Sequence, residues 1–91
     1  MTARFEVRYA TSFVKLIAKQ PVAIQRQARD RINDFRYGIN LERLRDHALQ
    51  GKYKGYRSIN ISGDVRALYY QQADGTVVIF AVIGTYSQLY G

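Results

Sequence analysis

Residues 58–83 decide the fold, and they read SINISGDVRALYYQQADGTVVIFAVI. Ile59 and Ile61 alternate with polar residues, which is the period of a strand with one buried face. Turn-forming residues follow at 62–64 (Ser-Gly-Asp) and at 73–75 (Ala-Asp-Gly), and strand-forming residues flank each of them. This stretch therefore predicts an antiparallel meander of three strands.

The last of these strands, over residues 76–83, is apolar at both odd and even positions. We expect it to be the central strand of the sheet, covered on both faces. Gly84 should end it and leave a short tail over residues 85–91. Residues 39–55 show a single turn of helix at Leu41 and Leu44, and then a loop framed by Gly51 and Gly55.

Upstream of the meander the apolar spacing changes. Phe5, Val7 and Tyr9 alternate with charged residues and predict a first strand, after which Thr11 or Ser12 can cap a helix. Apolar residues then recur at helical spacing through residues 11–37, interrupted at Pro21 and stopped by Gly38. We therefore expect one α+β domain over residues 1–91: a strand, two helices and the meander, with the helices on one sheet face and the other face exposed.

Charge points to a polyanionic partner. The 91 residues carry fourteen Lys and Arg against seven Asp and Glu, a net charge of +7. Arg66 is the only cation after residue 57. Arginine suits bidentate recognition of phosphate, so nucleic acid is the expected partner, with an acidic protein as the alternative.

Several classes of protein are excluded. The chain has no cysteine and one histidine, so it has neither a disulfide framework nor a multi-histidine metal site, and we expect no cofactor. Its longest apolar run, residues 77–83, is too short to cross a membrane, and no apolar secretion signal opens the sequence. We expect a cytoplasmic protein that makes no membrane contact.

Four residues suit metal-free cleavage of RNA, in which the 2′-hydroxyl attacks the adjacent phosphate. His47 and Asp64 are candidate proton acceptors, Tyr86 could serve the leaving oxygen, and Arg66 could neutralise the phosphate. Each also has a structural alternative: a surface histidine, a turn aspartate, a solvated arginine, and a tyrosine covering the core edge. The segment 51–57 interleaves cations with aromatic rings, which can bind phosphates and stack on unpaired bases, or fold back on the core.

Three blocks resemble the YafQ-like branch of the RelE/ParE toxin superfamily. Residues 46–57 (DHALQGKYKGYR) are similar to its "His-x-Leu-x-Gly, aromatic, Lys-Gly-x-Arg" block. Residues 63–70 (GDVRALYY) resemble its "Gly-Asp-x-Arg-x-x-Tyr" strand, and residues 83–90 (IGTYSQLY) its "Gly-Thr-His-Ser-x-Leu-Phe" ending. Three blocks in the right order are more specific than any one of them.

The resemblance implies the toxin of a type II toxin–antitoxin system, a ribosome-dependent endoribonuclease that cleaves mRNA and is silenced by a cognate antitoxin. It implies an acidic antitoxin that binds the toxin as a hetero-oligomer. His47 and Asp64 match active-site residues of the family, Arg66 its phosphate-contacting arginine, and Tyr90 its functional C-terminal aromatic. Asn60 would orient the substrate, and the predicted contacts to the RNA backbone are Arg45, Lys52, Lys54 and Arg57.

Two positions depart from the family pattern. Asn60 and Tyr86 stand where YafQ-like toxins carry histidines, so we expect attenuated cleavage, because a phenol is a poorer proton donor at neutral pH than an imidazolium. The alternatives are a non-catalytic superfamily member that poisons DNA gyrase or binds only its antitoxin, and a nucleic-acid-binding module without toxicity.

Overall fold

The computed structural model describes residues 2–72 and 74–91, and its elements follow the predicted order. Strand β1 spans Glu6–Tyr9, and helices α1 and α2 span Thr11–Ala18 and Val22–Tyr37. A single turn, α3, covers Leu41–Leu44, and β2 is a two-residue strand, His47–Ala48. The 3₁₀ turn η1 (Gly51–Tyr53) precedes β3 (Arg57–Ser62), β4 (Val65–Gln71), β5 (Val77–Thr85) and α4 (Tyr86–Tyr90).

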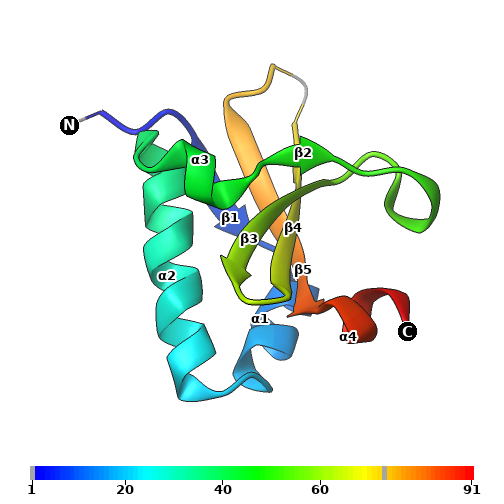
Figure 1. Cartoon of the computed structure of the whole chain (residues 1–91). Coiled ribbons are helices and arrows are strands. Elements are labelled where there is room, and N and C mark those ends of the chain that lie inside the picture. Colours follow the sequence, from blue (N-terminus) through cyan, green and yellow to red (C-terminus); the bar gives the residue numbers. More distant parts are fainter. Residues whose placement is uncertain (1, 73) are drawn as a thin grey trace.

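The α+β fold and the meander are confirmed. Strands β3, β4 and β5 are antiparallel neighbours within a five-stranded sheet of order β1-β5-β4-β3-β2. Strand β1 adds parallel to β5 at one edge, and β2 adds antiparallel to β3 at the other. Figure 1 shows α2 running along one face of this sheet, with α1 beside the lower end of α2.

The core lies between the helices and the sheet. Phe13 of α1 and Ile32 and Phe35 of α2 pack there against Tyr69 of β4 and Phe80 of β5. Phe35 is fully buried, and its ring centroid lies 5.6 Å from that of Phe80 and 4.8 Å from that of Tyr69. The apolar period of α2 therefore faces the sheet, as the sequence predicts, and Gly38 ends α2 in the left-handed conformation at φ 71°.

Two expectations about single elements are wrong. Strand β4 is the central strand, and β5 lies between β4 and β1. Strand β5 is apolar in both phases because α1 packs against it on one face and α4 on the other. Neither Thr11 nor Ser12 caps α1: Ala10 is the N-cap residue, and the Ser12 hydroxyl donates a hydrogen bond to the carbonyl of Ala81 at 2.7 Å.

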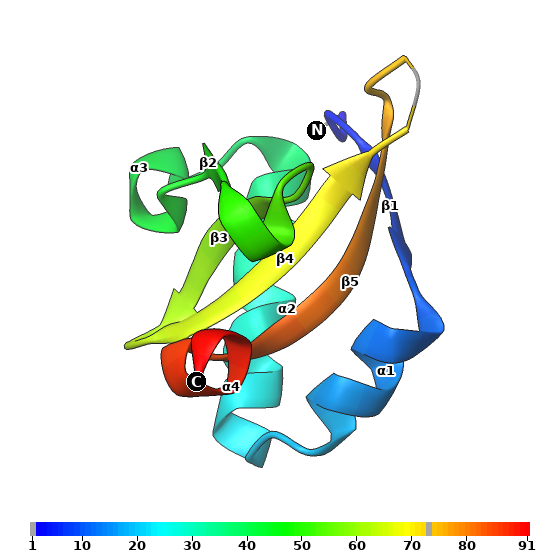
Figure 2. The same cartoon turned by 90° about the vertical axis from the view of Figure 1, so that its right-hand side faces the viewer.

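The sheet face opposite α2, called here the open face, is not bare. Helix α4 and the η1 turn lie in front of it (Figure 2), although residues 85–91 were expected to form a tail and the segment between Gly51 and Gly55 a loop. Strand β5 also continues through Gly84 to Thr85. In the second predicted turn, Asp74 accepts hydrogen bonds from Thr76, whereas Ala73 lies outside the described residues. No helix among the described residues is long and apolar enough to span a membrane.

Candidate active site on the open face

The turn between β3 and β4 places two predicted site residues side by side. Asn60 of β3 pairs with Arg66 of β4, and Arg66 pairs with Gly84 of β5. Residues directly opposite each other in a sheet share a face, so both side chains belong to the open face. The Arg66 guanidinium folds toward the turn, where Nη1 donates to the carbonyl of Gly63 at 2.9 Å and to that of Val65 at 3.3 Å.

Asp64 and Tyr86 meet at the same end of the sheet. The backbone N–H of Tyr86 donates to the Asp64 carbonyl at 3.0 Å, and their neighbours Val65 and Thr85 are cross-strand partners. Asp64 is exposed, and 60% of Tyr86 is accessible to solvent. The structure therefore gathers an acid, a cation, an amide and a phenol around one turn.

His47 lies on the open face at a distance from that turn. It pairs with Ser58 of β3, and Ser58 pairs with Leu68 of β4, which lies two residues after Arg66. Strand spacing and rise per residue place the Cα atoms of His47 and Arg66 about 12 Å apart. The two long side chains can both reach a nucleotide that lies between them.

The imidazole of His47 has a defined proton arrangement. Its Nδ1 atom lies 2.7 Å from the carbonyl oxygen of Arg45. A carbonyl only accepts hydrogen bonds, so Nδ1 carries a proton. In the neutral ring the lone pair is consequently on Nε2, which is free to accept a proton from a ligand.

Helix α4 and the η1 turn are fastened to each other over the open face. The Leu89 carbonyl accepts hydrogen bonds from Lys52 Nζ and Tyr53 Oη, both at 3.0 Å. The Leu89 side chain is buried. Ring contacts extend this link into a row of five tyrosines with neighbouring centroids 4.9–6.2 Å apart, in the order Tyr86, Tyr90, Tyr53, Tyr56 and Tyr70.

Local sequence explains why α4 forms there. The Thr85 side chain accepts from the Gln88 backbone N–H at 3.1 Å, and the Gln88 side chain accepts from the Thr85 N–H at 2.8 Å, a complete capping box. Gly84 lets the helix approach the strand, because a Cβ atom at that position would lie 3.0 Å from Gln88 Oε1. This helix was not predicted from the sequence, although the Thr85-x-x-Gln88 spacing signals it.

The predicted RNA-binding cations divide into two groups. Lys52, Lys54 and Arg45 are exposed, and Lys52 and Lys54 flank Tyr53 at the η1 turn. Arg57, in contrast, pairs with Tyr69, whose ring packs in the helix-side core, and its Nε donates to Asp46 Oδ1 at 3.0 Å. The structure thus separates Arg57 from the other three cations. Sequence reasoning also missed Asp46, because no local pattern shows a contact 23 residues away.

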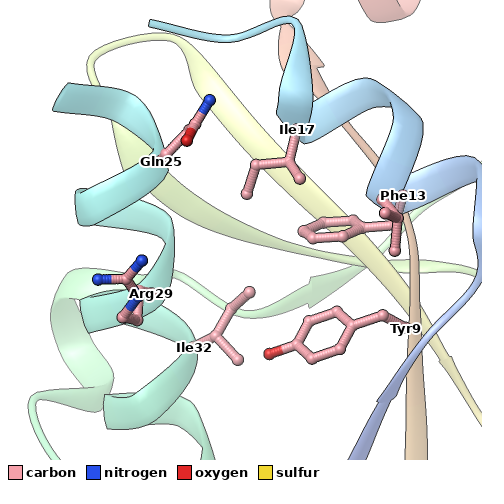
Figure 3. A pocket seen from close by; sticks show the side chains of 7 residues that line it. Tyr9, Phe13, Ile17, Gln25, Arg29 and Ile32 are labelled. Carbon is pink, nitrogen blue, oxygen red and sulfur yellow. The ribbon is translucent and has the colours of Figure 1, made fainter. Parts of the chain in front are cut away.

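A groove of about 300 Å³ lies on the helix side, away from the open face. Figure 3 shows Phe13 and Ile17 of α1 opposite Ile32 of α2, with Arg29 one turn along α2 and Tyr9 of β1 at one end. Tyr9 and Val14 are 46% and 55% exposed. The groove is apolar with a basic rim, so it differs in chemistry from the site on the open face. The described residues contain no group of three or more His, Cys, Asp and Glu side chains placed to hold a metal ion.

The sequence and the fold of this chain both match known proteins. Residues 2–91 match a family model described as the bacterial toxin of a type II toxin–antitoxin system, YafQ. The crystal structure of YafQ from E. coli strain BL21(DE3) is similar at 21% identity and a TM-score of 0.72, covering 96% of this chain and 99% of that one.

Toxins in complexes are similar too. The E. coli DinJ–YafQ toxin–antitoxin complex contains a chain 21% identical at a TM-score of 0.71, with 97% and 99% of the two chains covered. The archaeal RelE–RelB complex from Pyrococcus horikoshii OT3 contains one 19% identical at 0.69, with 90% and 94% covered. A search of curated proteins found no match.

Proposed function

Because the chain belongs to the YafQ family of toxins of bacterial type II toxin–antitoxin systems, we propose that it is an endoribonuclease that cleaves mRNA on the ribosome. One observation carries this proposal. The turn between β3 and β4 collects Asp64, Arg66 and Tyr86 on the face that also carries His47. A proton acceptor, a phosphate-binding cation and a hydroxyl group are what internal cleavage of RNA requires.

The reaction needs no metal ion, because the substrate supplies the nucleophile. The 2′-oxygen attacks the adjacent phosphorus, and the bond from phosphorus to the 5′-oxygen breaks. A base takes the proton of the 2′-hydroxyl, and an acid returns one to the departing 5′-oxygen. The products are a 2′,3′-cyclic phosphate and a 5′-hydroxyl end, so atoms and charges balance without an added reactant.

We assign the base to His47 and place Asp64 second. With Nδ1 protonated against the Arg45 carbonyl, the lone pair of Nε2 is available for the 2′-hydroxyl proton. Arg66 holds the phosphate, whose negative charge increases in the transition state. Asp64 lies closer to Arg66 than His47 does, so it is the alternative base. The cleavage rates of His47→Ala and Asp64→Asn distinguish the two assignments.

The remaining residues would bind and orient the RNA. Tyr86 serves the leaving oxygen, Asn60 orients the phosphate beside Arg66, and Tyr90 stacks on a base. Arg45, Lys52 and Lys54 bind the backbone. A phenol donates a proton less readily than an imidazolium, so we propose attenuated cleavage and expect Tyr86→His to raise the rate.

Mapping of transcript ends in a translating system tests the function. With purified ribosomes and mRNA, the protein should generate new 5′ ends that become ligatable only after phosphorylation, since they carry a hydroxyl. His47→Ala and Arg66→Ala should each lower the rate by about tenfold or more. Arg26→Ala, which removes an exposed cation from α2, is the matched control and should cut at the parent rate.

Other outcomes would replace this proposal. Linearised DNA accumulating with purified gyrase, without new mRNA ends, would favour a gyrase poison. Unchanged growth on induction, with neither effect, would leave a protein that only binds its antitoxin or nucleic acid.

We further propose a cognate acidic antitoxin as partner, and a cytoplasmic location where ribosomes are accessible. The net charge of +7 and the groove with its Arg29 rim suit an acidic, amphipathic segment. Binding should weaken as salt concentration rises, because screening reduces attraction between surface charges. Equal affinity for the co-expressed antitoxin at low and high salt would contradict this.

A further inference from the structure

A hydrogen-bonded trio lies beneath the edge strand that carries His47. Tyr69 Oη donates to Asp46 Oδ2 at 2.6 Å, and Arg57 Nε donates to Asp46 Oδ1 at 3.0 Å. Both donors belong to the helix-covered face, where Tyr69 is 2% exposed. We call Asp46, Arg57 and Tyr69 the Asp46 anchor.

The core holds this anchor in place. The Tyr69 ring centroid lies 4.8 Å from that of Phe35 and 5.3 Å from that of Phe80, so the hydroxyl has little freedom to move. Burial, together with the hydrogen bond and charge of Asp46, raises the pKa of Tyr69. The phenol therefore remains protonated around neutral pH and donates to the carboxylate.

The position of His47, in contrast, is only weakly fixed by its own strand. It is exposed, and β2 is a two-residue strand at the edge of the sheet. Arg45, whose carbonyl receives the Nδ1 hydrogen bond, stands in the left-handed region at φ 48°. Such a conformation is costly for arginine and persists only when its surroundings enforce it. Leu44, fully buried, fixes the chain just before this segment.

We propose that the Asp46 anchor positions the imidazole of His47, with Tyr69 and Arg57 acting through Asp46 as positioning residues. Successive side chains of a strand point to opposite faces, so a carboxylate held on the helix side turns the next side chain toward the open face. The anchored Asp46 also keeps the neighbouring Arg45 carbonyl beside His47 Nδ1. Adjacent Asp46 and His47 do not form an acid–base dyad, because His47 Nδ1 is bonded to the Arg45 carbonyl, whereas the Asp46 carboxylate is bonded to Tyr69 and Arg57.

Nuclear magnetic resonance reads this arrangement directly, because His47 is the only histidine. The ¹⁵N shifts of the parent ring at alkaline pH should show the Nδ1–H tautomer predominating. Tyr69→Phe removes one hydroxyl and keeps the packed ring, and it should shift the pattern to the Nε2–H majority of a free imidazole. Tyr37→Phe, the same change at the end of α2, should keep the parent pattern.

A second variant keeps the test decisive if Tyr69→Phe fails to fold. Asp46 lies at the surface, with 30% of its side chain exposed, so Asp46→Asn should fold and give the same tautomer change. Core amide shifts confirm folding in each case. A parent tautomer pattern in folded Asp46→Asn would overturn the proposal.

Cleavage kinetics then connect the anchor to the proposed function, on which the catalytic part rests. Tyr69→Phe should lower kcat about tenfold with KM unchanged, since the RNA-binding residues on the open face are untouched. Arg57→Lys should recover more activity than Arg57→Ala. If the parent cleaves no mRNA, the proposed function fails while the tautomer data still judge the anchor. If the parent cleaves and the tautomer is unaffected, only the anchor fails.

Discussion

One face of the sheet is covered by α1 and α2 through interlocking apolar side chains such as Phe13 and Phe35, whereas the open face is covered by α4 and η1. On the open face the cover is held by two hydrogen bonds to a single carbonyl, that of Leu89, and by tyrosine contacts. Close packing over a large area makes the first face the source of stability. The second face combines polar groups and exposed rings, which is the composition a ligand site needs.

The largest effect should come from breaking the helix-covered face. Phe35→Ala removes a fully buried ring that contacts Phe5, Tyr69 and Phe80, so the free energy of unfolding should fall by about 3–5 kcal/mol. Urea denaturation followed by circular dichroism measures it. A loss below about 1 kcal/mol would mean that the core does not depend on this ring.

Crowding the open face should cost less. Gly84→Ala places a methyl group 3.0 Å from Gln88 Oε1 and 3.1 Å from Gln88 Cβ, which forces α4 outward. We expect a loss of about 1–3 kcal/mol, together with faster amide exchange in α4. Ser87→Ala, an exposed change in the same helix, is the control. Unchanged α4 exchange in Gly84→Ala would show that Gln88 simply moves aside.

Removing one hydrogen bond from the open face should cost less again. Tyr53→Phe deletes the hydroxyl that donates to Leu89 while keeping the ring contacts with Tyr56 and Tyr90. The expected loss is about 1 kcal/mol by the same denaturation assay, because Lys52 still donates to that carbonyl. If the loss equals that of Gly84→Ala, the hydroxyl and not the packing holds α4.

At neutral pH, the ionisation of Tyr69 should have the smallest effect on the free energy of unfolding. Its pKa is raised above the ordinary value of about 10, first by burial and then by Asp46. The contribution of the protonated Tyr69 hydroxyl to folding stability is therefore complete below about pH 10. It is lost as pH rises through the higher pKa of Tyr69 in the folded state. Absorbance at 295 nm should show one of the eight tyrosines titrating last, and this step should vanish in Tyr69→Phe.

The sequence predicts the helix-covered face better than the open one. The sequence predicts the burial of Ile59, Ile61 and the apolar residues of α2, because alternation and helical spacing are local signals. The two-residue strand β2 and the parallel pairing of β1 with β5 carry no such signal, since both depend on chain segments far apart.

The candidate site shows the same division. The turn at 62–64 brings Asn60 and Arg66 together through local hairpin geometry, so their proximity could be predicted. Arg57 and Lys54 look alike in sequence, yet pairing with Tyr69 takes Arg57 to the helix side. The pairing register of a strand decides which of its side chains point to which face of the sheet. Here the register depends on partner strands that sequence spacing alone does not identify.

The parallel pairing of β1 with β5 also constrains the order in which the chain folds. Residues 6–9 pair only with residues 77–80, so the first strand in the chain is among the last to join the sheet. A contact of such sequence separation closes slowly and late. Asp64 and Tyr86 likewise meet only once the end of β5 has paired with β4, so the candidate site forms late in folding.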